Sequence, residues 1–544
     1  MIMSLTFDPS YHRYPSARNP VFAKNGMVCT STPQASAAGI EILKMGGNAI
    51  DAAVAAASTL TVTEPTANGL GSDAFALIWS EKDQKLYGLN SSGRAPALAS
   101  IDRVLADGKD NAGKMPVYGW TPVTVPGAPK AWAEVVRCFG RLSLSEDLSP
   151  AVQYAREGYP VSANLAYLWQ NAFRVYSQRR DDPAFAAWFD TFAPGDKVPV
   201  AGDLVKLPHH ADTLEEIGAT NADSFYSGEL AKTIDTESRK FGGYLRFEDL
   251  AAHKADWVEP ISVHYRGFDV CEIPPNGQGI VCLMALNILK EFTFAVRDDA
   301  KTLHRQIEAM KMAFADAFRY ITDPAFMELD YHDLLRPEYG AARAALMTDR
   351  AQEYGPGLPP KSGTVYLCTA DGEGNMVSFI QSNYNGFGSG MVIPGTGIAL
   401  QNRGADFSLD PAAANSLQPG KRSYHTIIPG FLMEKGKPVG PFGVMGAYMQ
   451  PQGHLQVVTN AIDFHLDPQQ CLNAPRWQWM RDGSVAVEPG IDPQIVLQLQ
   501  RMGHRVRVEP SPYSFGRGQM IVRLENGVLC GGTEPRTDSN IASF

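Results

Sequence analysis

Two short alternating segments joined by a turn sequence are the feature of this chain that most restricts its fold. Residues 364–370 (Thr-Val-Tyr-Leu-Cys-Thr-Ala) and 376–382 (Met-Val-Ser-Phe-Ile-Gln-Ser) have the composition of half-buried strands. Residues 371–375 between them (Asp-Gly-Glu-Gly-Asn) are typical of a tight turn. We therefore predict a β-hairpin that is symmetric about this turn, with Thr364 directly opposite Ser382 and their Cβ atoms about 5 Å apart. On spacing alone, two hydroxyl side chains on a half-buried face are the simpler interpretation of this pair.

Apolar patterns along the rest of the chain predict both helices and strands. Helices are expected within residues 34–60, interrupted at Gly46-Gly47-Asn48, within residues 125–158, entered through Pro126-Gly127, and over residues 303–321. Further strands are expected at residues 425–433, 440–445 and 519–524. Residues 353–362, rich in proline and glycine, are typical of an exposed linker. The sequence thus predicts a helix-rich first two-thirds and a strand-rich last third.

The composition is that of a globular protein and excludes a chain that binds nucleic acid. The 544 residues are 44% hydrophobic and 19% charged, and 48 basic against 58 acidic residues give a net charge of −10. No segment of the sequence concentrates lysine or arginine, which a surface for phosphate backbones requires.

The first residues and the cysteines argue against a secreted, membrane-bound or metal-binding protein. Residues 1–8 lack the basic and apolar regions of a secretory signal, and the most apolar stretch, residues 49–62, is too short to span a bilayer. The seven cysteines are an odd number without a Cys-x-x-Cys pair, which argues against a disulfide framework or a zinc site. The pair His209-His210 has no partners at metal-ligand spacing. We expect a cytoplasmic protein with reduced thiols, no bound metal and no membrane contact.

Residues 362–378, which contain the predicted hairpin, resemble the start of the small subunit in the γ-glutamyltransferase family. Members of this family are N-terminal-nucleophile hydrolases, made as one chain that cuts itself before a threonine. Other segments resemble the family in the same order along the chain: GGNAIDAA (46–53), GRAP (93–96), VPG (125–127), AREGYPV (155–161), ADFS (405–408), NAPR (473–476) and TEPR (533–536). The resemblance covers nearly the whole chain, and this shared order is more specific than any single motif.

The resemblance implies a fold and a subunit organisation. The expected fold is a four-layer αββα sandwich of the N-terminal-nucleophile hydrolase type. Cleavage between Gly363 and Thr364 would give a large subunit, residues 1–363, and a small catalytic subunit, residues 364–544. Both would contribute strands to one intertwined fold and stay together as a heterodimer, and two heterodimers could pair. The resemblance implies no cofactor and no metal.

The resemblance also implies how the chain reacts. The hydroxyl of Thr364 would be the nucleophile, and its freed α-amino group, with an ordinary pKa near ~8, would be the general base. Ser382, at the position of a family threonine, would orient that hydroxyl. Residues 443–448 resemble the oxyanion loop of the family, which would place the backbone N–H donors at Gly446 and Ala447. Alanine replaces a glycine of the family here but keeps its N–H.

The residues expected to bind the substrate depart from the γ-glutamyl pattern. Arg94 lies near the family arginine that holds a substrate carboxylate, and Asp406 corresponds to the aspartate that receives the substrate α-amino group. Arg403 stands where the family usually has a neutral amide, and His425-Thr426 replaces a pair of serines.

Three further departures bear on the acceptor and on activity. Tyr384 replaces an asparagine that helps to hold the amino-acid end, and Val365-Tyr366 replaces the usual Thr-His after the nucleophile. Residues 407–421 are short compared with transpeptidases that carry a lid loop there. A shorter lid favours water over a second substrate as the acceptor.

These departures are similar to those of the hydrolase branch of the family, which includes oxamate amidohydrolases, glutathione-hydrolase-like proteins and cephalosporin-acylase-like proteins. We expect an autoprocessing amidohydrolase that cleaves the amide of a small carboxylate-bearing substrate, resembling oxamate, through an acyl-enzyme on Thr364 and releases ammonia. The alternatives are a γ-glutamyl hydrolase or transpeptidase acting on glutathione, and an inactive relative with a binding role. The segment Gly386-Phe-Gly-Ser-Gly390 only weakly favours a dinucleotide or phosphate site, because it lacks the Gly-x-Gly-x-x-Gly spacing.

Overall fold

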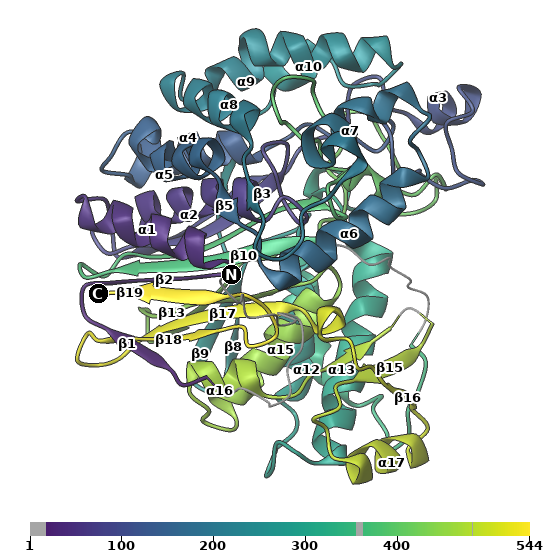
Figure 1. The fold of residues 1–544 in the computed structure, drawn as a ribbon. Helices are drawn as coiled ribbons and strands as arrows, with labels where there is room; N and C mark the ends of the chain where they lie inside the picture. Colours follow the sequence, from purple (N-terminus) through teal and green to yellow (C-terminus); the bar gives the residue numbers. More distant parts are fainter. Residues whose placement is uncertain (1–17, 355–362, 481) are drawn as a thin grey trace, which may run out of the picture.

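Two β-sheets, stacked face to face between two layers of helices, form the body of the computed structural model (Figure 1). The structure describes residues 18–354, 363–480 and 482–544. Each of the two sheets has seven strands, and every pairing within them is antiparallel. This layered arrangement agrees with the expected αββα sandwich.

The two sheets are named here after one strand of each, β10 and β13. The β10 sheet has the order β19 (Asn540–Ser543), β2 (Gly26–Thr30), β10 (Gly363–Asp371), β11 (Met376–Tyr384), β3 (Asp73–Ser80), β4 (Lys85–Ser91) and β7 (Asp256–Val258). The β13 sheet has the order β1 (Val21–Ala23), β18 (Leu529–Thr533), β17 (Arg517–Arg523), β13 (Lys437–Met445), β12 (Gly430–Glu434), β9 (Phe268–Glu272) and β8 (Ile261–Tyr265).

Helices cover the outer face of each sheet (Figure 1). Over the β10 sheet lie α1 (Pro33–Lys44), α2 (Ala49–Thr63), α4 (Ala128–Phe139) and α5 (Leu144–Glu157), with α6 (Ala163–Ser177), α7 (Ala186–Phe192), α8 (Pro208–Ala219), α9 (Asp223–Ser227), α10 (Glu229–Lys240), α11 (Phe247–Ala251) and α3 (Ile101–Ala106) farther out. On the side of the β13 sheet lie α12 (Gly279–Leu289), α13 (Ala300–Tyr320), α14 (Pro337–Ala344), α15 (Met449–Ile462), α16 (Pro468–Asn473) and α17 (Pro493–Arg501). Two small sheets complete the fold. One has three strands, β14 (Trp477–Trp479), β15 (Ser484–Val487) and β16 (Arg505–Val508), and the other pairs β5 (Tyr159–Pro160) with β6 (Leu204–Val205).

Strand β10 is buried on both faces because it lies in the middle of these layers. Val365 and Leu367 belong to the apolar cluster beneath α2, whereas Tyr366 and Cys368 belong to the cluster between the two sheets. Alternate residues of a strand point to opposite faces, so a strand placed between two cores must be apolar on both. This explains why the segment is richer in apolar residues than a surface hairpin.

The break predicted inside residues 34–60 is real and has a local cause. Gly46 has φ +103°, which ends α1, and Asn48 caps α2. The side-chain oxygen of Asn48 accepts from the N–H of Ile50 at 2.9 Å, while the carboxylate of Asp51 accepts from the N–H of Asn48 at 2.7 Å. This reciprocal capping starts a helix whose 15 residues are all buried. The helices expected within 125–158 and over 303–321 are α4, α5 and α13.

The predicted hairpin is confirmed, with one change at its open end and with both strands buried on both faces where half-buried strands were expected. The ladder runs from Val365 opposite Gln381 to Ala370 opposite Met376, which is the predicted register. Gly363, however, lies opposite Tyr384, so the register shifts between Gly363 and Val365. Thr364 therefore falls in an irregular part of the ladder and not in a regular pair with Ser382, whose partner on its other side is Asp73 of β3.

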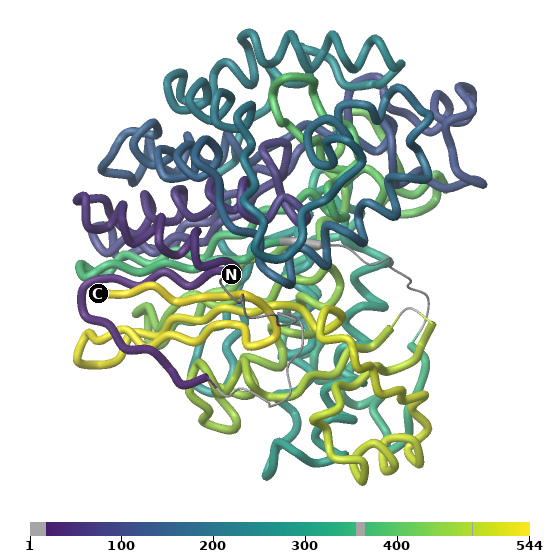
Figure 2. Tube along the Cα trace, viewed as in Figure 1, coloured from purple at the N-terminus to yellow at the C-terminus, as the bar shows by residue number. Residues whose placement is uncertain are grey.

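Segments from both sides of residue 363 alternate in both sheets. Strand β2 lies between β19 and β10, and the four strands β18, β17, β13 and β12 from after residue 363 lie between β1 and β9 from before it. Figure 2 shows the purple strand from the start of the chain beside the yellow strand from its end. The two parts could not separate without breaking ladders in both sheets.

Two expectations from the sequence need adjustment, and a third falls mostly outside the described residues. The strand expected at 425–433 begins only at Gly430, since His425 bonds instead to the segment 276–278. The last third also carries α15, α16 and α17, and the first two-thirds supply half of the strands of the two sheets. Of the expected linker, residues 355–362 lie outside the described part.

Two other sequence-based statements can be compared with the described residues. No helix among them is long and apolar enough to cross a membrane. All seven cysteines are described, none is in a disulfide, and all but Cys138 are buried.

Candidate active site

The open end of the hairpin lies beside the end of β13. Thr364 belongs to β10, and its side chain lies outside the described part of the structure. Two residues along, the ring of Tyr366 packs so closely on Gly443 that a Cβ at Gly443 would lie 2.5 Å from the ring. Gly443 comes three residues before Gly446, so this part of β10 packs across the two sheets on the end of β13 that leads into the 446–447 turn.

The turn formed by Gly446 and Ala447 joins β13 to α15. Gly446 has φ +132°, a conformation that favours glycine, and a Cβ there would lie 3.0 Å from the Cα of Gly516. Ala447 has φ +55°, in the left-handed region, which costs an alanine roughly 1–2 kcal/mol. The turn directly precedes the 14-residue helix α15, whose amino end favours negative charge.

Ser382 ends the regular part of β11 and fixes the chain that follows. Its Oγ accepts a hydrogen bond of 2.8 Å from the backbone N–H of Tyr384. Tyr384 has φ +76° and is fully buried. The hydroxyl of Ser382 thus supports the sharp turn of the chain that brings the Tyr384 ring toward Arg403.

Arg403 is a buried cation with unused hydrogen-bonding capacity. Its side chain is 1% exposed, its Nη1 donates to Oγ1 of Thr426 at 2.7 Å, and its guanidinium carbon lies 4.1 Å from the centre of the Tyr384 ring. The Nε and Nη2 groups are buried and have no hydrogen-bond partner among the described residues. Burial lowers the pKa of Arg403, and the nearby carboxylate of Asp406 is the largest influence that raises it. Unpaired buried N–H groups are costly, so we expect a hydrogen-bond acceptor from outside the chain to join them.

Asp406 shares one turn with Arg403. The short 3-10 helix Arg403–Asp406 places the two side chains on the same face, with Nη1 of Arg403 3.7 Å from Oδ2 of Asp406. Oδ1 of Asp406 accepts from the hydroxyls of Tyr384 at 2.6 Å and Tyr448 at 3.2 Å. The carboxylate is therefore already surrounded by donors.

His425 and Thr426 are held by residues that the sequence did not single out. The backbone of His425 bonds to Asn276 and Gln278, both at 2.9 Å. The side-chain amide of Gln278 donates to the carbonyl of Thr426 at 2.6 Å and to that of Ala447 at 2.8 Å. Gln278 therefore connects the substrate-binding candidates to the 446–447 turn.

The imidazole of His425 forms a buried pair with Asp73. Its Nε2 lies 3.0 Å from Oδ2 of Asp73, and the N–H of Ile427 points to its Nδ1 at 3.4 Å. Nε2 must therefore carry the proton that is donated to Asp73. Burial raises the pKa of Asp73 to about 7, although Arg403 opposes this shift. Burial also holds the pKa of His425 well below its usual range, so the ring is neutral.

The structure thus brings most of the predicted site residues together. Contacts run from Ser382 through Tyr384 and Asp406 to Tyr448, and from the neighbouring 446–447 turn through Gln278 to Thr426 and Arg403. Asp73, Gln278 and Tyr448 were missed from the sequence, because each is recognised only by a partner far away in the chain, and no local motif marks them.

Arg94 is the exception among the predicted residues. Its guanidinium is 43% exposed and bonds to Asp323 and to the carbonyl of Gly420, both at 3.0 Å. It lines a separate cavity of about 230 Å³ together with Arg422. No described hydrogen bond or ion pair joins it to Arg403 or His425.

The glycine-rich segment considered in the sequence analysis does not form a dinucleotide site. Residues 386–390 follow β11 but lead into turns and the bridge between Val392 and Ala399, not into a helix. A dinucleotide site needs a strand followed by a helix at this point, so that alternative is not supported.

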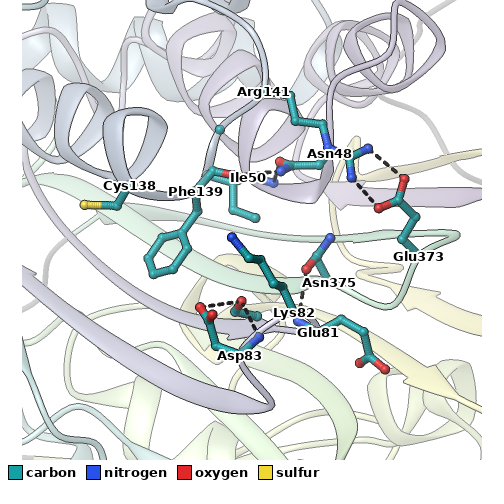
Figure 3. A pocket seen from close by; sticks show the side chains of 12 residues that line it. Asn48, Ile50, Glu81, Lys82, Asp83, Cys138, Phe139, Arg141, Glu373 and Asn375 are labelled. Atoms are coloured by element: carbon teal, nitrogen blue, oxygen red, sulfur yellow. Dashed lines mark hydrogen bonds and ion pairs between the residues drawn. The ribbon is translucent and has the colours of Figure 1, made fainter.

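A polar cavity of about 470 Å³ lies at the turn end of the hairpin (Figure 3), beside the ion pair of Arg141 and Glu373. That end of β10 is opposite to the end that holds Thr364.

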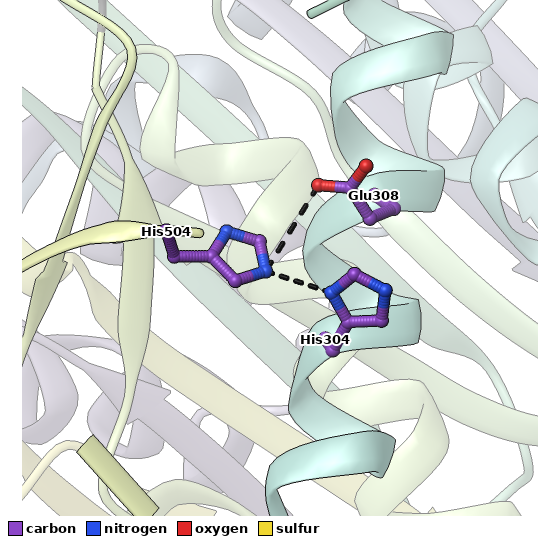
Figure 4. A group of neighbouring side chains, drawn as sticks. All are labelled: His304, Glu308 and His504. Carbon is purple, nitrogen blue, oxygen red and sulfur yellow. Dashed lines mark hydrogen bonds and ion pairs between the residues drawn. The ribbon is translucent and has the colours of Figure 1, made fainter. Parts of the chain in front are cut away.

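One cluster of metal-ligand types was not foreseen from the sequence. His304, Glu308 and His504 are buried within 4.8 Å of one another (Figure 4). Nδ1 of His304 and Nε2 of His504 are hydrogen-bonded at 2.8 Å, and Lys311 lies 2.6 Å from the Glu308 carboxylate. These atoms satisfy one another, and the network ties α13 to the turn before β16.

Comparison with known proteins shows to which family the chain belongs. Residues 35–544 match the gamma-glutamyltranspeptidase family. The chain belongs to this family. It is 35% identical to the glutathione hydrolase-like YwrD proenzyme of Bacillus subtilis (strain 168), covering 95% of this chain and 98% of that protein. It is 34% identical to the oxamate amidohydrolase proenzyme of Klebsiella pneumoniae, covering 96% and 98%.

A solved structure supports the same placement of the chain in the gamma-glutamyltranspeptidase family. The crystal structure of cephalosporin acylase from Bacillus halodurans superposes with a TM-score of 0.96, at 55% identity and 99% coverage of both chains. The protein is accordingly an amide hydrolase that acts on C–N bonds, and the resemblance to the hydrolase branch is confirmed.

Proposed function

We propose that the chain cuts itself between Gly363 and Thr364 and then hydrolyses the amide of a carboxylate-bearing acyl group through an ester on Thr364. In the first step the Thr364 hydroxyl adds to the carbonyl carbon of Gly363, the C–N bond breaks, and the hydroxyl proton passes to the new amine. Water then hydrolyses the ester, leaving the carboxylate of Gly363 and a free amine on Thr364. The interleaved sheets would hold residues 1–363 and 364–544 together as a heterodimer.

Substrate hydrolysis would repeat this chemistry in the formed site. The hydroxyl of Thr364 adds to the amide carbon while its own amine takes the proton and delivers it to the departing nitrogen, which leaves as ammonia. Water then adds to the ester and releases the acyl group as a carboxylate. Ser382 would orient the nucleophile, and the N–H groups of Gly446 and Ala447 would stabilise the oxyanion at the amino end of α15.

The observation that carries the substrate class is the guanidinium of Arg403. It is buried, bonds to Thr426 through one nitrogen and leaves Nε and Nη2 unpaired among the described residues. Two N–H groups on one planar fork are suited to a carboxylate, which can accept both. An acyl group with a carboxylate near its amide, as in oxamate, would complete this set of bonds.

The same residues disfavour a γ-glutamyl substrate. Its α-ammonium group would need Asp406, but Oδ1 of Asp406 already accepts two tyrosine hydroxyls and Oδ2 lies 3.7 Å from Arg403. An ammonium placed there would face a cation in a buried setting, where like charges repel strongly. Glutathione hydrolysis or transfer therefore remains the second candidate, and an inactive binding protein is the third.

A matched set of amides tests this proposal. The purified protein should release ammonia from oxamate or glutaramate at least about tenfold faster than from L-glutamine, which differs from glutaramate only by its α-ammonium group; tenfold corresponds to about 1.4 kcal/mol. Glutamate release from glutathione should not increase when glycylglycine is added as an acceptor. Preference for glutamine over glutaramate, or product that depends on the acceptor, would contradict the proposal.

A further inference from the structure

We propose that Asp73 is a positioning and specificity-determining residue of this site, which holds Thr426 in place through His425 and limits the positive charge that Arg403 offers to an anionic substrate. This inference rests on the proposed function. It concerns a residue of β3 that lies outside the residues expected from the sequence.

Asp73 is fixed at the centre of the site. It is fully buried and lies opposite Ser382 in the ladder between β3 and β11. Oδ1 accepts from the N–H of Gly93 at 2.9 Å, and Oδ2 accepts from Nε2 of His425 at 3.0 Å. Both oxygens are thus used, and the carboxylate cannot turn without giving up a bond in a buried place.

His425, held by Asp73, in turn fixes the position of its neighbour Thr426, which bonds to Arg403. Its peptide groups bond to Asn276 and Gln278, and its ring packs edge-on against Phe75 with the ring centres 4.8 Å apart. The next residue, Thr426, accepts from Nη1 of Arg403. Without Asp73, the Nε2–H of a buried imidazole would lose its acceptor, and the ring and the adjacent Thr426 would lose their anchor.

The charge of Asp73 acts directly on Arg403. The groups that face Asp73 are the neutral His425, the cations Arg403 and Arg422, and the phenol of Tyr226. Arg422 is already paired with Asp256 at 2.8 Å and bonds to the carbonyl of Ser92. Arg403 is therefore the cation whose field the Asp73 carboxylate reduces, in addition to the larger effect of Asp406, and a substrate carboxylate must compete with both.

This competition predicts a pH dependence of binding. The pKa of Asp73 is raised to about 7 by burial, so its carboxylate is neutral below that pH and charged above it. The KM for an anionic amide should therefore rise as the pH passes from 6 to 8.5, by about tenfold, the ratio that corresponds to one pKa unit. The value of kcat should follow the Thr364 amine and not this group.

The test measures KM and kcat for oxamate between pH 6 and 8.5 in three processed proteins. Asp73→Asn should remove the part of the KM rise that is centred near pH 7 and leave only the change caused by the Thr364 amine, whose ordinary pKa is about 8. Asp147→Asn is the matched control, because Asp147 is also a buried carboxylate, with a pKa raised to about 9, but lies on α5. It should keep the wild-type change in KM. His425→Gln keeps the charge of Asp73 and an N–H donor, so it should keep the pH dependence while raising KM several-fold at every pH.

The outcomes separate this inference from the proposed function. A flat KM profile in the wild type, or a profile that Asp73→Asn leaves unchanged while oxamate is still hydrolysed, overturns the role of Asp73 alone. If Asp73→Asn does not fold, the wild-type and His425→Gln profiles still decide. If no carboxylate-bearing amide is hydrolysed by the wild type, the proposed function fails and this inference fails with it.

Discussion

Replacing Thr364 by alanine should leave a single uncut chain with no measurable amide hydrolysis. The variant has no hydroxyl to attack the carbonyl of Gly363, and without cleavage it has no free amine to act as a base. Loss of a nucleophile that acts as one unit with its base lowers kcat by about 10⁴-fold to 10⁶-fold. Ammonia release from oxamate and gel analysis of the denatured protein measure both effects.

Another threonine of the same strand provides the control. Thr369 lies five residues further along β10, and its hydroxyl donates to the carbonyl of Ala49 at 2.6 Å. Thr369→Val should lower the free energy of unfolding by about 0.5–1.5 kcal/mol, because the carbonyl of Ala49 loses one of its two donors. It should still be cut and active. Normal turnover by Thr364→Ala would refute the assignment of the nucleophile.

Replacing Arg403 by methionine should strongly lower kcat/KM for a carboxylate-bearing amide. A buried charge that loses its partner costs about 2–5 kcal/mol, which corresponds to roughly a 30-fold to 4,000-fold loss in kcat/KM for oxamate. The loss should appear mainly in KM if the carboxylate is bound equally in the ground state and the transition state. Arg403→Lys should recover only part of it, since lysine keeps the charge but not the planar fork.

Replacing Arg94 by methionine is the control that shows which arginine binds the substrate carboxylate. The resemblance maps Arg94 near the family arginine that binds a carboxylate, whereas the structure pairs it with Asp323 in a separate cavity. Arg94→Met should therefore change kcat/KM for oxamate by less than about threefold, as for a partly exposed ion pair. A large effect of Arg94→Met together with a small effect of Arg403→Met would show that Arg94, and not Arg403, binds the substrate carboxylate.

The sequence predicts local structure well where the cause is local. The hairpin is set by alternation and by the Asp-Gly-Glu-Gly-Asn turn, and the break between α1 and α2 is set by Gly46 and the Asn48 cap. Its register is predicted correctly from Val365 onward. The shift before Val365 is not predicted, because it depends on Tyr384, whose left-handed backbone is held by Ser382 and the surrounding site.

The candidate site is less accessible to sequence reasoning because its contacts join distant segments. Asp73 and His425 are 352 residues apart, and Gln278 reaches Ala447 across 169 residues. Family resemblance indicates His425 and Arg403, but it does not show that Arg403 is buried or that His425 is neutral. Those properties arise only when the two sheets close over the polar groups and remove water.

Self-cleavage before Thr364 can be measured by the intact mass of the purified, denatured protein. We expect two fragments, residues 1–363 and 364–544, that run together in solution until they are denatured, while Thr364→Ala gives one chain of 544 residues. A wild-type protein that stays a single chain after long incubation would contradict this expectation, since the amine of Thr364 would then be blocked and the chain would have to act by binding alone.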